Sequence, residues 1–177
     1  MASLRTPVTA ADHHEGPAEA PLTLVEYGDY ECPHCGRAFP IVKAVQKALK
    51  GKLRFVFRNF PISQIHPHAE HAAIAAEAAA RQGQFWPMHD RIFLHQPNLD
   101  DASLRRMAGD LKLDLEQFDR DVLDPALAAR VQKDFNSGVR SGVNGTPTFY
   151  VNGVRVDTGF SYDELLAALE DALEATK

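Results

Sequence analysis

The sequence predicts an α/β fold in which strand-forming segments at both ends of the chain enclose a long helical segment. Two apolar runs, 22–27 and 53–60, are rich in β-favouring residues and flank a helical repeat, which indicates a βαβ unit. Near the end, Asn152-Gly153 separates two further apolar runs, and this dipeptide is typical of a two-residue hairpin turn. Residues 61–141 keep helical patterns throughout. The predicted order is therefore βαβ, helices, ββα.

The helix of the βαβ unit is predicted to begin at Pro33 and to stop at Gly51. Proline suits a first helical turn because the amide it lacks has no partner there. Apolar residues recur at helical spacing along this segment: Ala38, Phe39, Val42, Val45 and Leu49. Cys32 is therefore expected at the N-terminal edge of the helix.

Helical patterns in the middle of the chain predict five helices, over 68–81, 84–94, 101–111, 115–123 and 125–138. Asp114 with Gln117 resembles a capping box, and so does Ser161 with Glu164 ahead of a last leucine-rich helix. The aromatic segment 85–90 is expected to pack into the core, because large aromatic side chains at helical spacing usually bury themselves.

The length of 177 residues suits one globular unit. Residues 1–20 are expected to form a polar, flexible arm. The strand-bearing domain is assigned to 21–60 and 142–177, with 61–141 as a helical insertion in the same globular unit.

Composition excludes several classes of protein. Hydrophobic residues make up 45% and charged residues 24%, which is typical of a chain that folds in water. The net charge of −5, without a Lys/Arg cluster, argues against nucleic acid. No run reaches the roughly 18 apolar residues of a membrane span. The first twenty residues lack a secretory signal, which predicts a cytoplasmic protein, or a periplasmic one if a signal was removed.

The two cysteines of the chain stand in Cys32-Pro33-His34-Cys35. A thiol at the first turn of a helix meets unpaired amides and the positive end of the helix dipole, which stabilise its thiolate. Cys32 is the expected nucleophile. Cys35 lies about one turn further on, where it can attack a mixed disulfide at Cys32. His34 adds stabilisation to the thiolate and should make the disulfide more oxidising.

These residues resemble the DsbA-like branch of the thioredoxin superfamily. The resemblance covers about residues 8–176 and rests on Cys32-Pro33-His34-Cys35, on Thr146-Pro147 before a strand, and on the helical insertion. It implies a thioredoxin fold around a mixed sheet. It also implies thiol–disulfide exchange with protein or peptide thiols, a redox partner that resets the pair and is not identified, and no cofactor.

The resemblance assigns roles to three more residues. It predicts a cis bond before Pro147 and a substrate-binding role for Thr146 and Pro147; the alternative is a trans proline that opens a strand. Glu26, six residues before Cys32, corresponds to a buried carboxylate that takes the proton of Cys35. The alternative is a structural ion pair of Glu26 with Arg54 or Arg58.

Three alternatives remain open from the sequence. His66, His68 and His71 with the cysteines offer ligands for zinc or copper, although the second cysteine pair of a structural zinc site is missing. A substrate-binding or chaperone-like module without redox catalysis is the second alternative. The third concerns direction: Pro33-His34 favours an oxidant, whereas the absent signal favours a reductase in a reducing compartment, and an isomerase would use the same site.

Overall fold

The computed structural model describes residues 2–177, and these form two compact units. Unit 1 contains the sheet and is built from three stretches of chain; unit 2 contains most of the helices and the cysteine pair. Unit 1 comprises the described residues up to Gly28, with Arg37–Arg58 and Asn136–Lys177, and unit 2 comprises Asp29–Gly36 and Asn59–Phe135.

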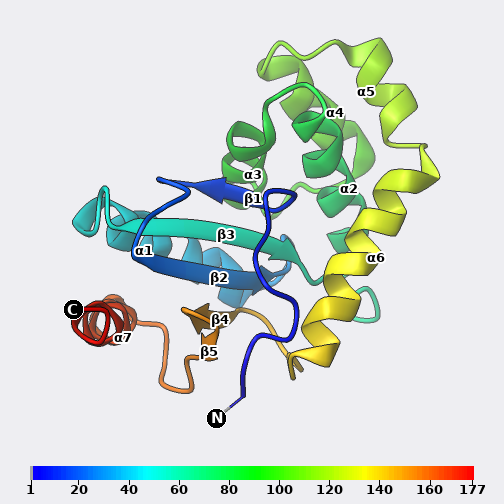
Figure 1. Cartoon of the computed structure of the whole chain (residues 1–177). Helices are drawn as coiled ribbons and strands as arrows, with labels where there is room; N and C mark the ends of the chain where they lie inside the picture. The colour runs from blue at the N-terminus through cyan, green and yellow to red at the C-terminus, as the bar shows by residue number, and fades with distance from the viewer. Residues whose placement is uncertain (1) are drawn as a thin grey trace. The chain divides into compact units, whose positions relative to one another are not determined.

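A five-stranded sheet in the order β1-β3-β2-β4-β5 forms the centre of unit 1. Neighbours pair antiparallel in β1–β3, β2–β4 and β4–β5, whereas Figure 1 shows β2 and β3 pointing the same way, so the sheet is mixed. The βαβ unit and the hairpin predicted from the sequence are confirmed. The strands are β1 (His13–Glu15), β2 (Leu22–Gly28), β3 (Leu53–Asn59), β4 (Thr148–Val151) and β5 (Val154–Arg155).

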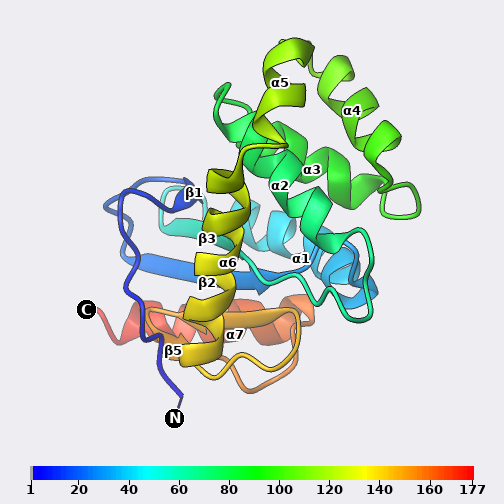
Figure 2. The same ribbon diagram turned by 90° about the vertical axis from the view of Figure 1, so that its right-hand side faces the viewer.

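Two helices complete the core of unit 1. Helix α1 (Pro33–Ala48) connects β2 to β3, and Figures 1 and 2 show it along one face of the sheet. Helix α7 (Tyr162–Glu174) packs on β2 and β4 and buries Leu165 and Leu169 completely. At the hairpin, Asn152 and Gly153 both have positive φ, +47° and +84°, as a primed turn requires.

The segment before β2 is more ordered than its polar composition suggests. Strand β1 pairs with β3, with His13 opposite Phe57. The buried Arg58 guanidinium donates to the Asp12 carboxylate at 2.9 and 3.0 Å, to the carbonyls of Thr6 and Pro7, and to the Tyr27 hydroxyl. Burial lowers the pKa of Arg58, but hydrogen bonds to Asp12 and Tyr27 outweigh it and raise that pKa. Contacts with residues far along the chain hold this segment in place, and the local sequence of residues 1–20 does not indicate them.

Unit 2 is built around an alanine-rich helix. Helix α2 (Ala69–Ala80) packs against α3 (Phe85–Leu94), α4 (Asp101–Asp110) and α5 (Leu115–Asp121). Every residue of α2 except Glu70, His71 and Ala80 is buried. Small side chains let the neighbouring backbones approach closely. Helix α6 (Pro125–Arg140) follows, and its Arg130 donates to the buried carboxylate of Glu77 at 2.8 Å. The five helices predicted from periodicity are confirmed, as is the burial of Phe85 and Met88.

The two predicted helix caps differ in their completeness. At α7, Ser161 and Glu164 form the full reciprocal capping box. At α5, Asp114 accepts from the amide of Gln117, but the Asp114 amide donates to Gln82 at 2.8 Å instead of to Gln117. Half of that prediction was therefore wrong, because a side chain from a distant turn competes successfully for the amide.

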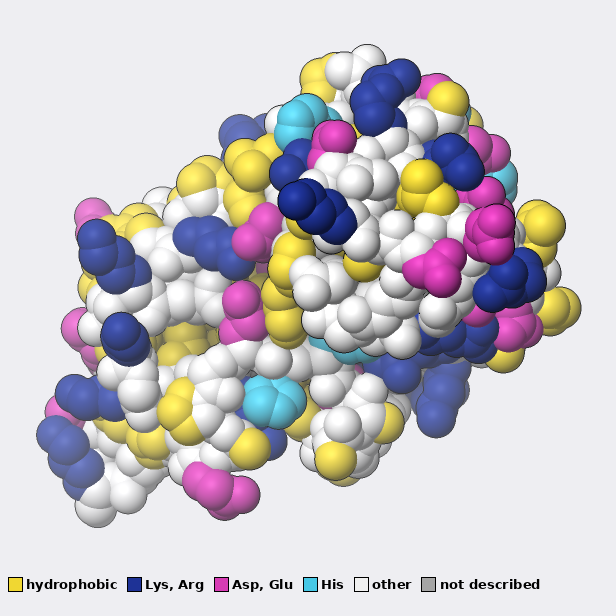
Figure 3. All heavy atoms as spheres, turned by 90° about the horizontal axis from the view of Figure 1, so that it is seen from above, with side chains coloured by type: hydrophobic (Ala, Val, Ile, Leu, Met, Phe, Trp, Pro, Cys, Tyr) yellow, Lys and Arg dark blue, Asp and Glu magenta, His cyan; other side chains and the backbone are white. Residues whose placement is uncertain are grey.

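Side chains of both charges, Lys and Arg as well as Asp and Glu, are scattered over the face drawn in Figure 3. Within residues 2–177, none of the helices is long and apolar enough to cross a membrane.

Candidate functional site

The cysteine pair lies at the start of α1, as predicted. Cys32 directly precedes the first helical residue, Pro33, and its carbonyl accepts from the amide of Gly36 at 3.0 Å, which closes the first turn. Cys32 is 4% exposed and Cys35 is fully buried, whereas Pro33 and His34 are exposed. The motif therefore exposes Pro33 and His34 to solvent and keeps both cysteines buried.

Asp29 makes a hydrogen bond to each cysteine, and the sequence did not point to this residue. Its carbonyl accepts from the Cys32 amide at 3.1 Å, and its own amide donates to Cys35 Sγ at 3.4 Å. Its buried carboxylate accepts from the amides of Glu31 and Ile62 at 2.8 and 2.9 Å and contacts His66 Nδ1 at 2.7 Å. Asp29 thus connects both cysteines to a second loop of unit 2.

Gln96 holds the same turn from another direction. Its Nε2 donates to the carbonyls of Tyr30 and Cys32, at 2.8 and 2.9 Å. These carbonyls precede the helix or lie at its first turn, so the side-chain amide fixes the backbone that carries Cys32. Nothing in the local sequence pattern marks Gln96, because its partners are 64 and 66 residues away along the chain.

An aromatic cluster supports the turn from within unit 2. The Tyr30 hydroxyl and His89 Nδ1 lie 2.9 Å apart, and both residues are almost completely buried. Phe93 packs on both rings, with centroid distances of 4.9 and 5.1 Å. The aromatic segment predicted as core therefore packs, through His89, against Tyr30, which lies two residues before Cys32.

In unit 1, Glu26 lies on β2, opposite Phe149 of β4, and is 3% exposed. The alternative partner Arg58 uses all five of its N–H donors on Asp12, Tyr27, Thr6 and Pro7. Arg54 donates to the hydroxyl of Thr23. Glu26 is therefore a buried carboxylate on a central strand, as the resemblance implied.

The peptide bond between Thr146 and Pro147 is cis, as the resemblance predicted. The Thr148 hydroxyl donates to the Gly145 carbonyl at 2.7 Å, which fixes the turn immediately before β4. Pro147 also borders a pocket of about 310 Å³ within unit 1, whose lining includes Thr148, Arg155 and Asp157.

The histidines considered as metal ligands have separate partners. His66 contacts Asp29, and His71 Nδ1 lies 2.7 Å from Asp101 at an exposed position. His68 donates its backbone amide to Glu31. Over residues 2–177, no three His, Cys, Asp or Glu side chains are grouped so that they could hold a metal ion.

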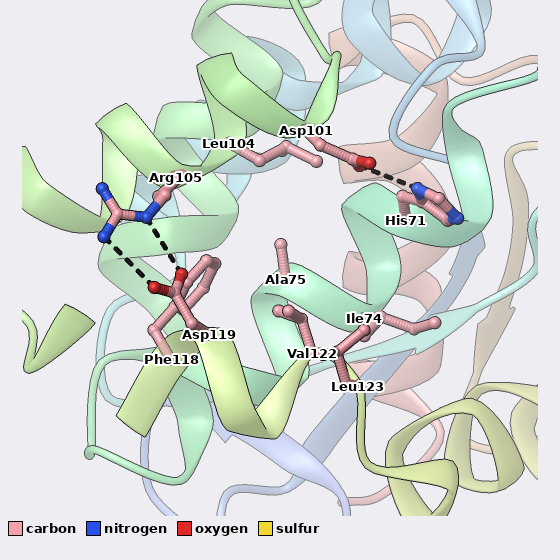
Figure 4. A pocket seen from close by; sticks show the side chains of 10 residues that line it. All are labelled: His71, Ile74, Ala75, Asp101, Leu104, Arg105, Phe118, Asp119, Val122 and Leu123. Carbon is pink, nitrogen blue, oxygen red and sulfur yellow. Dashed lines mark hydrogen bonds and ion pairs between the residues drawn. The ribbon is translucent and has the colours of Figure 1, made fainter. Parts of the chain in front are cut away.

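A second pocket in unit 2, of about 250 Å³, lies between α2, α4 and α5. Figure 4 shows apolar side chains such as Ile74, Ala75 and Val122 around it, with the Arg105–Asp119 and His71–Asp101 pairs at its sides. The polar side chains near this pocket pair with one another, and its lining contains neither cysteine.

Comparison with known proteins gives a consistent result for most of the chain. A family model described as Thioredoxin matches residues 8–171. A thioredoxin-like oxidoreductase from Silicibacter pomeroyi is 30% identical, over 94% of this chain and 92% of that one, with a TM-score of 0.81. BdbD from Bacillus subtilis is 28% identical, over 92% and 93% of the two chains, with a TM-score of 0.83. The α-DsbA1 protein of Wolbachia pipientis shares the fold at 21% identity, over 98% and 96% of the two chains, with a TM-score of 0.81.

Curated relatives give a second kind of match. Na(+)/H(+) antiporter NhaA 3 of Salinispora tropica is 44% identical over 166 residues, which are 94% of this chain and 25% of the antiporter. NhaA of Herminiimonas arsenicoxydans is 41% identical over 94% of this chain and 26% of its own length. The chain therefore spans about a quarter of the length of these relatives.

Proposed function

Because this chain belongs to the thioredoxin family, we propose that it is a DsbA-like thiol–disulfide oxidoreductase that exchanges disulfides with protein or peptide thiols through Cys32 and Cys35. The observation that carries the proposal is a cysteine pair at the N-terminal end of α1, held by Asp29 and Gln96. Antiport is not proposed, since the match covers a quarter of the antiporters.

The reaction proceeds in two exchanges. A substrate thiolate attacks Cys32 Sγ in the Cys32–Cys35 disulfide; the bond between the two cysteines breaks, and Cys35 leaves as a thiolate. A second substrate thiolate then attacks the substrate sulfur of the mixed disulfide and releases Cys32 as a thiolate. The two substrate thiolates lose two electrons as they form their disulfide, and the cysteine pair gains these electrons as two thiolates. A redox partner restores the disulfide by the reverse exchange.

Cys32 is the sulfur that substrates attack in this proposal. The positive end of the α1 dipole and the amides of the first turn of α1 stabilise the Cys32 thiolate. This stabilisation makes Cys32 a good leaving group. His34, exposed between the cysteines, adds a donor or a positive charge. Both effects stabilise the reduced pair and make the disulfide more oxidising, so we propose net oxidation of substrates.

By resemblance, three residues outside the motif also take part in the reaction. By resemblance, the backbone of Thr146 pairs with the substrate chain beside Pro147. Replacing Pro147 by Ala is then expected to lower kcat/KM while leaving the alkylation rate of Cys32 unchanged. Glu26 takes the proton of Cys35, a role supported by its burial on β2. When Cys32 has attacked a substrate disulfide, Glu26→Gln should slow the attack of Cys35 on the resulting mixed disulfide without slowing the first attack by Cys32.

Alkylation and trapping test the proposal directly. Iodoacetamide should modify Cys32 at pH 6 faster than it modifies free cysteine, whose pKa is about 8.5. Cys32→Ser should abolish disulfide exchange with reduced, unfolded protein substrates. Cys35→Ser should accumulate a mixed disulfide when it is given a substrate disulfide, because the Cys32 thiolate attacks that disulfide and no second cysteine displaces it. Exchange that survives Cys32→Ser would refute the mechanism.

Equilibration with glutathione tests the direction. A pair that oxidises its substrates should equilibrate at a potential well above that of thioredoxin, which is about −270 mV. His34→Ser should lower the reduction potential of the cysteine pair. His71 is an exposed histidine of α2, and His71→Ser should leave the potential unchanged. A wild-type value near that of thioredoxin would contradict net oxidation and favour a reductase.

A further inference from the structure

One residue of unit 2 touches both cysteines through its main chain. The Asp29 carbonyl accepts from the Cys32 amide at 3.1 Å, and the Asp29 amide donates to Cys35 Sγ at 3.4 Å. The latter contact reaches the reacting atom of the resolving cysteine itself. Asp29 is 1% exposed, so water does not compete for these bonds.

The side chain of Asp29 is fixed as firmly as its main chain. One carboxylate oxygen accepts from the Glu31 amide at 2.8 Å, while the other accepts from the Ile62 amide at 2.9 Å and contacts His66 Nδ1 at 2.7 Å. The His66 side chain is 15% exposed and that of Asp29 is 0%. Three contacts to one buried carboxylate leave it little freedom to rotate, and the main chain of Asp29 is held with it.

Resting on the function proposed above, we propose that the Asp29 amide stabilises the Cys35 thiolate during exchange and that His66 positions this amide through the Asp29 carboxylate. When a substrate thiolate attacks Cys32, the electron pair of the broken S–S bond passes to Cys35 Sγ. The negative charge therefore develops where the amide already points. The Asp29 amide is a catalytic donor, and His66 is a positioning residue.

A donor that is in place before the reaction is more effective than water, because it needs no reorganisation as the charge forms. Hydrogen bonds to charged groups are roughly twice as strong as those between neutral groups. Displacing the amide should therefore raise the pKa of the Cys35 thiol by about one unit, which corresponds to about tenfold in its ionisation constant.

The Cys32→Ser variant isolates Cys35, because the chain contains two cysteines. A thiolate absorbs more strongly in the ultraviolet than a thiol does. Ultraviolet absorbance measured against pH then reports the ionisation of Cys35 alone. In this background, His66→Ala should raise the pKa of Cys35 by about one unit. Asp29→Asn breaks the same anchor but also removes a negative charge near the thiol, which by itself lowers the thiol pKa, so its rise should be smaller. Asparagine places an amide donor where the Ile62 amide and His66 need an acceptor, so it breaks the anchor with little change of volume.

Two further variants separate positioning from other causes. His66→Gln keeps a donor for the Asp29 carboxylate without a charge, and it should restore most of the ionisation lost in His66→Ala. A purely electrostatic effect of His66 on the thiolate would not be restored. His71→Ala removes a second His–Asp pair of the same 2.7 Å length from unit 2 and should leave Cys35 unchanged.

Unchanged ionisation of Cys35 in folded His66→Ala, with the fold checked by circular dichroism, would overturn the inference, whether or not Asp29→Asn folds. An equal shift in His71→Ala would also overturn it, since the effect would then be general. The ionisation measurement requires no enzymatic activity. A wild-type protein that fails to exchange disulfides would refute the proposed function, while the Cys35 shifts would still decide the role of Asp29 and His66.

Discussion

Gly36, the residue after Cys35, is required by a close approach of another side chain. A Cβ atom added at this position would lie 2.2 Å from Gln96 Oε1, whose amide group holds the Tyr30 and Cys32 carbonyls. The side chain of Gln96 can move, but only by giving up those two hydrogen bonds. Gly36 therefore allows the side-chain amide to reach the turn that carries Cys32.

We predict that Gly36→Ala lowers the free energy of unfolding when Gln96 is present and does not lower it when Gln96 is replaced by alanine. In the wild type, alanine should displace Gln96 and cost about 1–2 kcal/mol of unfolding free energy for the two hydrogen bonds, partly offset by the better helix propensity of alanine. In a Gln96→Ala background, the same change should be neutral or stabilising.

A double-mutant cycle by urea denaturation measures this coupling. Gly109→Ala is the matched control, since its added Cβ would meet only Leu115 at 3.7 Å, an ordinary contact. Equal effects of Gly36→Ala in both backgrounds would show that Gln96 does not hold the turn.

The residues of the site differ in how visible they are in the sequence. Cys32 and Cys35 could be identified from their spacing and from the helix that begins after them. Asp29 and Gln96 could not, because their decisive partners lie 33 to 66 residues away and only the folded chain brings them together. Asp29 carries a weak signal, in that an acidic residue follows the end of a buried strand.

At the scale of elements, β1 shows where local pattern fails. Its residues, His13, His14 and Glu15, have no apolar alternation, so nothing local predicts a strand. The strand forms because β3 offers an unpaired edge and because Arg58 holds the preceding segment through Asp12. In contrast, β4 and β5 were predictable, since Asn152-Gly153 determines their turn by its own backbone preference.

We predict that Asp12→Ala destabilises the protein by about 3 kcal/mol, because it leaves the charge of Arg58 buried without its carboxylate. Hydrogen exchange of the β1 amides should accelerate at the same time. The surface pair Arg105–Asp119 provides the control: its side chains are 52% and 49% exposed, and Asp119→Ala should cost under about 1 kcal/mol. Similar losses for the two variants would mean that the Asp12–Arg58 pair does not anchor β1.

The cap of α7 makes a pH-dependent contribution. Hydrogen bonds from the Ser161 side chain and backbone lower the pKa of Glu164 below its ordinary value of 4.5. A carboxylate whose pKa falls on folding stabilises the native state above its ordinary pKa, and this contribution disappears as the pH falls through the lower folded-state value.

Glu164→Gln keeps an acceptor oxygen but removes the charge. We predict a lower melting temperature than wild type at pH 7 and a difference that shrinks steadily below pH 4.5. Thermal unfolding followed by circular dichroism between pH 7 and pH 3 measures it. A difference that stays constant over this range would show that the charge of Glu164 does not support the cap.

At the scale of the whole molecule, the order of elements was predictable and their assembly was not. Periodicity gave the sequence of strands and helices, because each pattern is local. The sheet, however, joins strands from both ends of the chain, and the order β1-β3-β2-β4-β5 depends on pairings between residues more than a hundred positions apart, such as Leu24 with Val151. Such pairings are decided by the packing of whole elements.

The redox state of two atoms should be measurable in the stability of the entire chain. If the native fold stabilises the thiolate of Cys32 and favours the dithiol, then thermodynamic linkage requires the dithiol protein to unfold less readily than the disulfide protein. Each 30 mV by which the native pair is more oxidising than the same pair in the unfolded chain corresponds to about 1.4 kcal/mol. The small ring closed by Cys32 and Cys35 adds little opposing chain entropy.

We predict that the unfolding midpoint in urea is higher for the dithiol form than for the disulfide form, and that His34→Ser narrows the gap. Cys32→Ser, which cannot form the disulfide, should unfold identically in oxidising and reducing buffer. Since unfolding and glutathione equilibration measure the same free energy by independent routes, the two differences should agree. A disulfide form that is the more stable of the two would mean that the fold favours the disulfide, and the chain would then act as a reductant of its substrates.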